Sequence, residues 1–173
     1  FTGGSDATGT VNTAIDTLVS GGDDSDRPMA GWITASDESL ALYHEKYRQF
    51  IDTVFTSGWF ESQFDRVSAM IAPYVEKETR AFYSYEEFQT AADTLKTFCL
   101  KRAQSVQGQL DGSIPATSAA QQGSDALIDA SELSITAMGG MNNGKDGDRG
   151  GNAGFPGSFG GDFSFDGGSF IPG

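Results

Sequence analysis

Few side chains in this sequence have the types and spacing that chemistry requires. Asp146-Gly147-Asp148, with Asn142, Asn143 and Asn152 nearby, superficially resembles a calcium loop, because hard cations bind several oxygens on a flexible turn. The spacing does not fit, since the D-x-[DN]-x-[DN]-G frame is incomplete and no Glu closes it. We interpret this stretch as a solvated acidic linker and predict no metal site there.

The lone histidine and the lone cysteine have no evident chemical partner. His44 follows Tyr43 in a helical pattern, and we expect it on a solvated flank, without a general-base or metal-binding role. Cys99 follows Phe98 in another helical pattern and is predicted to be a small core residue. A single cysteine also excludes an internal disulfide.

Acidic and aromatic side chains gather where the second and third predicted helices connect. The acids are interpreted as helix-end charges, because a catalytic carboxylate pair needs one pKa raised by burial. The aromatic residues are interpreted as core and loop anchors. The two groups are Glu76, Glu78, Glu86 and Glu87, and Tyr74, Phe82, Tyr83 and Tyr85.

Arg102 lies near the apolar stripe of the third predicted helix. It pairs with an acid or a carbonyl inside the fold, or it is a helix-surface charge whose stem packs on the core. Neither role is catalytic. We therefore predict no catalytic, cofactor-binding or metal-binding residue within the 173 residues.

Three helices are indicated by apolar side chains at three- and four-residue spacing. Ser36 is a predicted N-cap for a helix over 37–55, and a second helix runs from about Phe60 to Tyr74. Because only Thr56-Ser57-Gly58 separates them, these two helices are predicted to form an antiparallel hairpin. Ser84 and Glu87 form a capping box that begins a third helix, which ends near Leu110. The apolar stripes are Leu40, Tyr43, Tyr47, Phe50, Ile51 and Val54; Phe60, Phe64, Val67, Ile71 and Tyr74; and Phe88, Ala91, Ala92, Leu95, Phe98, Cys99 and Val106.

The predicted fold class is mainly α, a small antiparallel three-helix bundle with an irregular N-terminal arm and a disordered Gly-rich tail. Residues 1–27 form the arm and 28–115 the helical subdomain. Residues 116–138 are predicted to be irregular and weakly ordered, and 139–173 a disordered tail rich in Gly, Phe and Asp.

The charge of the chain excludes several partners. Its net charge is −13, with −4 on residues 1–27, −3 on 28–110 and −6 on 111–173. Nucleic acids and anionic membrane surfaces need a basic footprint, so neither is an expected partner. No run approaches the roughly 20 apolar residues of a membrane span.

Four short stretches, in order and spacing, resemble the C-terminal part of the CotH (spore-coat protein H) kinase family. They are Arg27-Pro28-Met29, Ala72-Pro73-Tyr74-Val75, Phe82-Tyr83-Ser84-Tyr85-Glu86-Glu87-Phe88, and Lys101-Arg102 continued to Ile114-Pro115. Residues 12–17 are also similar to the family's loop before the Arg-Pro pair, except that Leu18 stands where a Pro is expected.

This resemblance implies an atypical protein kinase that transfers a phosphoryl group from ATP to protein Ser or Thr with a divalent metal such as magnesium. The family's metal-binding aspartates and nucleotide-binding lobe are expected before Phe1. The chain is accordingly predicted to be an inactive C-terminal fragment whose first partner is the missing N-terminal kinase lobe. The resemblance also implies an extracellular, cell-envelope or spore-surface location and a coat or cell-surface protein as substrate.

An alternative function remains open at this point. In this alternative, the chain is a non-enzymatic extracellular or spore-coat binding and adhesion module. Its bundle binds a partner, and its Phe-Gly tail tethers it to a surface layer. The lack of site residues and the acidic low-complexity tail favour this alternative.

Overall fold

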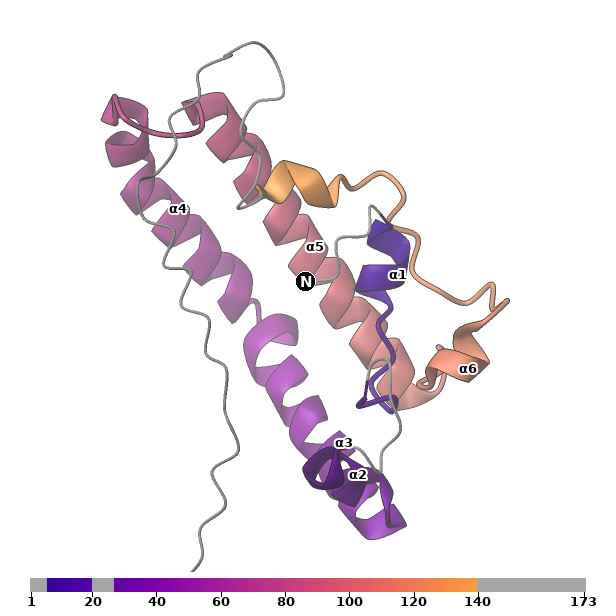
Figure 1. Cartoon of the computed structure of the whole chain (residues 1–173). Coiled ribbons are helices and arrows are strands. Elements are labelled where there is room, and N and C mark those ends of the chain that lie inside the picture. Colours follow the sequence, from indigo (N-terminus) through magenta and orange to yellow (C-terminus); the bar gives the residue numbers. More distant parts are fainter. Residues whose placement is uncertain (1–5, 20–26, 140–173) are drawn as a thin grey trace, which may run out of the picture. The chain divides into compact units, whose positions relative to one another are not determined.

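The described part of the chain is built from helices. A computed structural model describes residues 6–19 and 27–139, all within the first of two units into which the chain divides, Phe1–Met141 (Figure 1). These residues form six α-helices, one π-helical segment and one 3₁₀ segment, without a β-strand among them. The mainly helical prediction is confirmed for them. The predicted tail beyond Gly139 and the Asp146-Gly147-Asp148 stretch lie outside the described residues.

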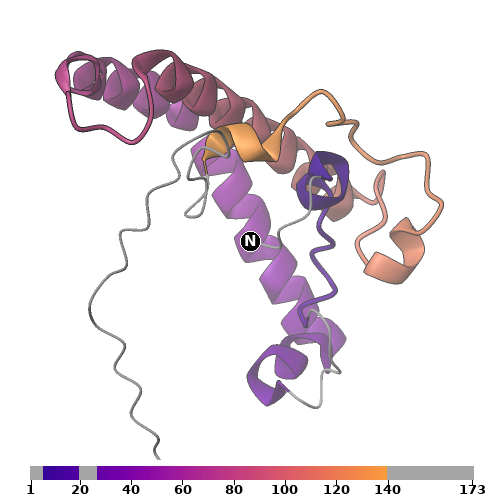
Figure 2. The same ribbon diagram turned by 45° about the horizontal axis from the view of Figure 1, so that its top comes forward.

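The first described segment begins with a short helix, α1 (Ala7–Val11). Asp6 caps it, because its Oδ1 accepts a 3.0 Å hydrogen bond from the Gly9 backbone N–H. Residues 12–19 follow without regular structure, and α1 packs along the long helix α5 (Figures 1 and 2).

The helices α2 (Pro28–Thr34) and α3 (Asp37–Ile51) begin where their sequences indicate. Pro28 stands at the first position of α2, where its missing N–H costs no intrahelical bond. The Ser36 side chain accepts a bond from the Ser39 N–H at 3.2 Å, and two acids occupy the first turn of α3. The predicted N-cap at Ser36 is confirmed.

The predicted antiparallel hairpin between 37–55 and 60–74 is wrong. The chain leaves α3 through a π-helical segment, η2 (Asp52–Thr56), and enters α4 (Trp59–Lys77) after Ser57 and Gly58. Figures 1 and 2 show α3 and α4 joined end to end at an angle, not side by side. The π-helical turn continues the coil, and the Phe55 and Phe60 rings pack across the junction with centroids 4.9 Å apart. Left-handed Gly58, with φ 76°, bends the path without reversing it.

The antiparallel hairpin is instead formed by α4 and α5 (Tyr85–Asp111). The predicted capping box of α5 is confirmed: Ser84 Oγ accepts from the Glu87 N–H at 3.2 Å, and Glu87 Oε2 accepts from the Ser84 N–H at 2.6 Å. Helix α4 continues past Pro73 to Lys77, so this proline lies inside its last turns.

Residues after α5 return along it. They include α6 (Ser118–Gln121) and the 3₁₀ segment η3 (Ile135–Met138), which packs on α5. Ala130, between these two elements, is fully buried. The predicted domain boundaries at residues 28 and 116 remain predictions.

The buried core lies around the second half of α5. One apolar cluster joins Ile15, Ile51, Ala103 and Val106, and a second joins Ala7, Val11 and Ala130. Residues from α1, from the irregular segment after it and from the chain beyond α5 therefore supply much of the core.

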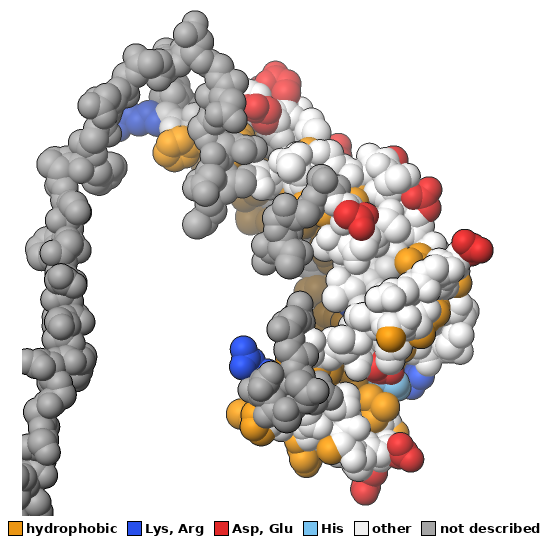
Figure 3. All heavy atoms as spheres, turned by 45° about the vertical axis from the view of Figure 1, so that its right-hand side comes forward, with side chains coloured by type: hydrophobic (Ala, Val, Ile, Leu, Met, Phe, Trp, Pro, Cys, Tyr) orange, Lys and Arg blue, Asp and Glu red, His pale blue; other side chains and the backbone are white. Residues whose placement is uncertain are grey.

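The prediction that three apolar stripes bury one another is wrong for α4, which contains no buried residue. Phe50 of α3 is 50% exposed and Leu95 of α5 is 42% exposed. Apolar side chains are accordingly visible on the surface around the hollow at the left of the described part in Figure 3. Helical periodicity identified apolar faces correctly, but it could not show what covers them.

Within residues 6–19 and 27–139, no helix combines the length and the apolar content that a bilayer span requires.

Candidate functional site

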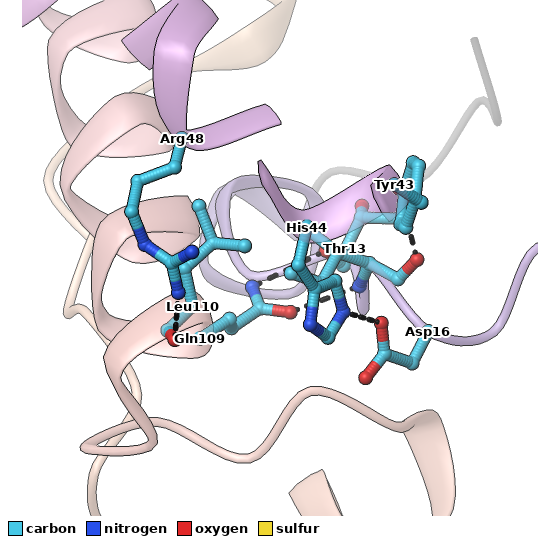
Figure 4. Close-up of polar contacts among 8 residues, drawn as sticks. Thr13, Asp16, Tyr43, His44, Arg48, Gln109 and Leu110 are labelled. Atoms are coloured by element: carbon cyan, nitrogen blue, oxygen red, sulfur yellow. Dashed lines mark hydrogen bonds and ion pairs between the residues drawn. The ribbon is translucent and has the colours of Figure 1, made fainter. Parts of the chain in front are cut away.

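Residues 12–16 run between α3 and α5, and polar side chains of both helices hold them (Figure 4). We call residues 12–16 the clamped segment. The side chains that bind it, which we call the clamp, belong to Tyr43 and His44 of α3 and to Arg102, Ser105 and Gln109 of α5.

Asn12 is the most extensively bonded residue of the clamped segment. Its side chain donates to the carbonyl oxygens of Thr8 at 2.9 Å and Ile128 at 2.8 Å. Its Oδ1 accepts from the Ile128 N–H at 3.0 Å and from the Ser105 hydroxyl at 2.8 Å. Because Asn12 is only 1% exposed, these bonds satisfy an amide that water does not reach. Asn12 thus joins the segment, α5 and the returning chain.

Three polar residues on one face of α5 hold the clamped segment and Val11 before it: Arg102 and Gln109 bond to its backbone, and Ser105 bonds to the Asn12 side chain. Arg102 Nη1 donates to the carbonyl oxygens of Val11 at 2.9 Å and Thr13 at 2.6 Å. Gln109 Oε1 accepts from the Ile15 N–H at 2.9 Å, and its Nε2 donates to Ser105 Oγ at 3.1 Å. Spacings of three, four and seven residues place these side chains on one helix face.

Helix α3 holds the other side of the clamped segment. His44 Nε2 lies 2.6 Å from Asp16 Oδ1, and the Tyr43 hydroxyl donates to the Ile15 carbonyl at 3.1 Å. The side chains of His44 and Asp16 are 23% and 15% exposed. This pair is therefore more sheltered than an ordinary surface ion pair.

Tyr43 stays protonated over the physiological pH range. Burial is the largest cause that raises its pKa from the ordinary 10.0 to about 12. The nearby Tyr47 and Asp16 raise this pKa further, whereas the Arg102 guanidinium lowers it. The phenol consequently remains a hydrogen-bond donor to the Ile15 carbonyl.

The end of α5 and the residues after it also bind the clamped segment and α3. The Asp16 N–H donates to the Ala116 carbonyl at 2.9 Å, and Arg48 of α3 donates to the Leu110 carbonyl at 2.9 Å. The Ile114 side chain folds back onto Gly108, where an added Cβ would lie 2.7 Å from Ile114 Cδ1. Only glycine at 108 allows this close approach.

The residues that include α3 and most of α5 match a known protein family. Residues 21–106 match the family described as CotH kinase protein. They belong to the CotH kinase family. No curated protein and no solved structure matches the chain. The matched residues include α2, α3, η2, α4 and α5 as far as Val106. The clamped segment precedes the CotH match and Gln109 follows it.

The His44–Asp16 pair has half of a familiar catalytic arrangement, a base oriented by a carboxylate. Catalysis by such a pair also needs a nucleophile or a substrate proton at the imidazole. Within residues 6–19 and 27–139, no hydroxyl or thiol is hydrogen-bonded to His44. The geometry supports a role in joining α3 to the clamped segment.

The CotH kinase family implies an ATP-dependent kinase, and the described side chains fit neither a nucleotide nor the metal expected with it. No group of three or more His, Cys, Asp or Glu residues among them is arranged to hold a metal ion. The cationic side chains around the clamp bind the protein itself: Arg102 and Arg48 donate to backbone carbonyls, and Lys101 pairs with Glu132 at 2.8 Å. A triphosphate would need such cations for its own oxygens. We derive no step of phosphoryl transfer from these residues.

The structure changes the interpretation of several predicted residues. Arg102 binds carbonyls inside the fold, which confirms one of its two predicted roles. His44 was expected on a solvated flank without a partner, and this is wrong because Asp16 contacts it. The anchoring prediction is wrong for Tyr74 and Phe82, which are 77% and 95% exposed. Tyr85 does pack, stacking on Phe88 at 6.2 Å.

Cys99 was predicted to be a small core residue, but it lies outside the two buried clusters. It is half-buried, and burial raises the pKa of its thiol. The four acids near the second connection occupy the ends of α4 and α5 and the residues beside them, as predicted.

No bonding role was predicted for Asn12, Ser105 or Gln109. Asn12, Ser105 and Gln109 lie in stretches that resemble the CotH family, and Ser105 and Gln109 follow Arg102 by three and seven residues, next to the apolar stripe that ends at Val106. Polar residues at such positions are buried only when partners satisfy them, and the partners here lie more than 90 residues away in sequence.

Proposed function

We propose that this chain is the helical part of a CotH-family protein kinase. In this proposal the whole protein transfers a phosphoryl group from ATP to Ser or Thr of a protein substrate with a divalent metal such as magnesium, and the 173-residue chain alone is inactive. The match of residues 21–106 to the CotH kinase family is the observation that carries the proposal.

The helical part acts in this proposal as a support. Residues 6–19 connect the rest of the kinase to the bundle, and the clamp fixes their course against α3 and α5. Arg102, Ser105 and Gln109 support this role, because each bonds a residue about 90 positions earlier. A rigid connection holds an attached catalytic part in one orientation, and small displacements at a reacting centre are costly in rate.

The nucleotide, the metal and the remaining partners belong to the rest of the proposed kinase. Its partners are the N-terminal kinase lobe and a coat or cell-surface protein substrate. Its proposed location is extracellular, in the cell envelope or on the spore surface. The strongly acidic charge of the chain is consistent with the absence of a nucleic acid from this set.

Incorporation of labelled phosphate tests the proposal. The product of the complete gene, with any residues before Phe1, is incubated with labelled ATP and magnesium, with and without a chelator, beside the 173-residue chain. We expect chelator-sensitive incorporation only in the complete product. A complete product that neither binds ATP nor incorporates phosphate would contradict the proposal.

Two matched variants test the role of the clamp. Gln109→Ala removes the bond to the Ile15 N–H, whereas Gln107→Ala changes an exposed glutamine on the same helix. We expect Gln109→Ala to lower the phosphorylation rate of the complete product by about tenfold, since roughly 1.4 kcal/mol of positioning corresponds to that factor. Gln107→Ala should leave the rate unchanged, and equal rates for both variants would remove the supporting role.

A second candidate function is a non-enzymatic extracellular or spore-coat binding module. The exposed apolar side chains of α4, among them Val67 at 38% and Met70 at 56%, favour it because exposed apolar patches mark binding surfaces. Recovery of envelope or coat proteins by the chain with and without residues 139–173 tests the tethering role of the tail. Equal recovery would contradict that role.

A further inference from the structure

The α4–α5 hairpin carries an apolar groove that the clamp does not use. Its volume is about 450 Å³. Phe60, Phe64, Val67 and Ile71 of α4 line it together with Phe88 and Leu95 of α5. Val67, Ile71 and Leu95 are 38%, 36% and 42% exposed, so these walls retain uncovered apolar surface.

The dimensions of the groove match a helix. Phe60 and Ile71 are separated by three helical turns, or about 16 Å at 1.5 Å per residue. A third helix that lies between two antiparallel helices buries both of their apolar faces. Such a helix contacts the groove through apolar residues at positions i, i+3 or i+4, and i+7.

The 3₁₀ segment η3 contributes to the wall of the groove. Met138, the last residue of the helical turn η3, contributes to the lining. Helix α5 and η3 form one of the principal packing interfaces of the fold. Because Met138 belongs to η3 and also lines the groove, the groove adjoins that interface.

Charges at the groove distinguish between possible helices. Arg66 donates to Oε1 of Gln63 at 3.0 and 2.8 Å, and Gln63 lines the groove, so a guanidinium stands at its edge. Asp65 and Asp93 line a second, smaller hollow that shares Phe64, Ser68, Phe88 and Ala92 with the groove, and Asp65 pairs there with Lys96 at 2.7 Å. An acidic side chain on the bound helix therefore complements the groove edge.

We propose that this groove binds an amphipathic α-helix of a partner protein, with its apolar face on Val67, Ile71 and Leu95 and an acidic flank next to Arg66. The inference concerns a binding surface and does not depend on phosphoryl transfer. The exposed apolar area is modest, so the expected affinity is on the order of 10 μM.

A designed peptide tests this proposal with the 173-residue chain. The probe is a fluorescently labelled peptide of about 16 residues with leucines at alternating three- and four-residue spacing and glutamates along one flank. Fluorescence anisotropy should show binding on the order of 10 μM. A peptide of the same composition, in scrambled order, should bind at least tenfold more weakly.

Variants of the protein locate the binding surface. Val67→Ser combined with Leu95→Ser should weaken binding of the glutamate peptide about tenfold, because it removes two exposed apolar contacts. Leu42→Ser is the matched control, since Leu42 is 53% exposed on α3. Arg66→Glu should reverse the preference between the glutamate peptide and one with lysine on the same flank, whereas Lys46→Glu should not. Circular dichroism verifies that each variant is folded.

Three results would overturn the proposal. The first is equal binding of the ordered and scrambled peptides. The second is unchanged binding after the Val67 and Leu95 substitutions. The third is a dimer, detected by sedimentation, that the same substitutions abolish and the peptide does not disrupt, because the groove then receives a second copy of the chain.

Discussion

The Ser105 hydroxyl of α5 donates a 2.8 Å hydrogen bond to Oδ1 of Asn12, across 93 residues of sequence. Both side chains are essentially buried, at 0% and 1% exposure. The same Asn12 oxygen accepts from the Ile128 N–H, so one amide joins the beginning, the middle and the end of the described chain. Burial of an amide is favourable only while its partners remain in place. This network therefore specifies how the clamped segment lies on α5.

Asn12→Ala should destabilise the protein strongly. The substitution leaves the Ile128 N–H, the Ile128 carbonyl and the Ser105 hydroxyl without their Asn12 partner in a buried site. Each unsatisfied buried group costs about 1–3 kcal/mol, so we expect a total loss of about 3 kcal/mol after partial relaxation. Urea denaturation measures the free energy of unfolding. Gln49→Ala, on the exposed surface of α3, is the control and should change it by less than about 0.5 kcal/mol.

The His44–Asp16 contact should appear as a coupling energy in a double-mutant cycle. The two side chains lie 2.6 Å apart and are mostly sheltered from solvent. Hydrogen bonds to charged groups contribute about 1.5–3 kcal/mol, so we expect His44→Ala and Asp16→Ala to be non-additive by about 1 kcal/mol or more. Denaturant unfolding of the four proteins measures this quantity. Strict additivity would show that the contact contributes nothing to folding.

Features that depend on neighbouring residues were predictable from the sequence. Ser36, Ser84 and Glu87 cap the helices that they were predicted to cap, and Gly112 follows the last residue of α5. The bonds of a helix end involve residues three or four positions apart, so a short stretch of sequence contains all of the information.

Features that depend on distant residues were not predictable in the same way. The pairing of α4 with α5, not with α3, follows from a π-helical junction that no residue pattern announces. The bonding of Asp16 to His44 joins residues 28 positions apart on elements whose relative placement the sequence does not give. The exposure of Val67 and Leu95 likewise depends on what covers an apolar face, whereas periodicity shows only that the face exists.

Gly108→Ala should destabilise the protein by overpacking. An added Cβ would lie 2.7 Å from Ile114 Cδ1 and 2.8 Å from Cγ1, and Ile114 is only 5% exposed. Overpacking a core site costs about 1–3 kcal/mol. Because the two shortest contacts involve Ile114, whereas Ser113 Oγ lies at 3.1 Å, the cost should be smaller when Gly108→Ala is made in an Ile114→Ala background. Thermal unfolding of the four proteins measures the difference, and an equal cost in both backgrounds would place the strain elsewhere.

The stability of the protein should decrease at alkaline pH through Tyr43. Its pKa is raised to about 12 in the folded state, against 10.0 for an unperturbed tyrosine, so the folded state retains a proton that the unfolded state loses. The contribution to stability is therefore complete below pH 10 and is lost as the pH rises toward about 12. Tyr43→Phe removes this contribution, and its unfolding free energy should decrease less between those two pH values. An ultraviolet titration should correspondingly show one late-ionising tyrosine that the variant lacks. Tyr74→Phe, at a tyrosine that is 77% exposed, is the matched control, and a late-ionising group that persists in Tyr43→Phe would contradict the assignment.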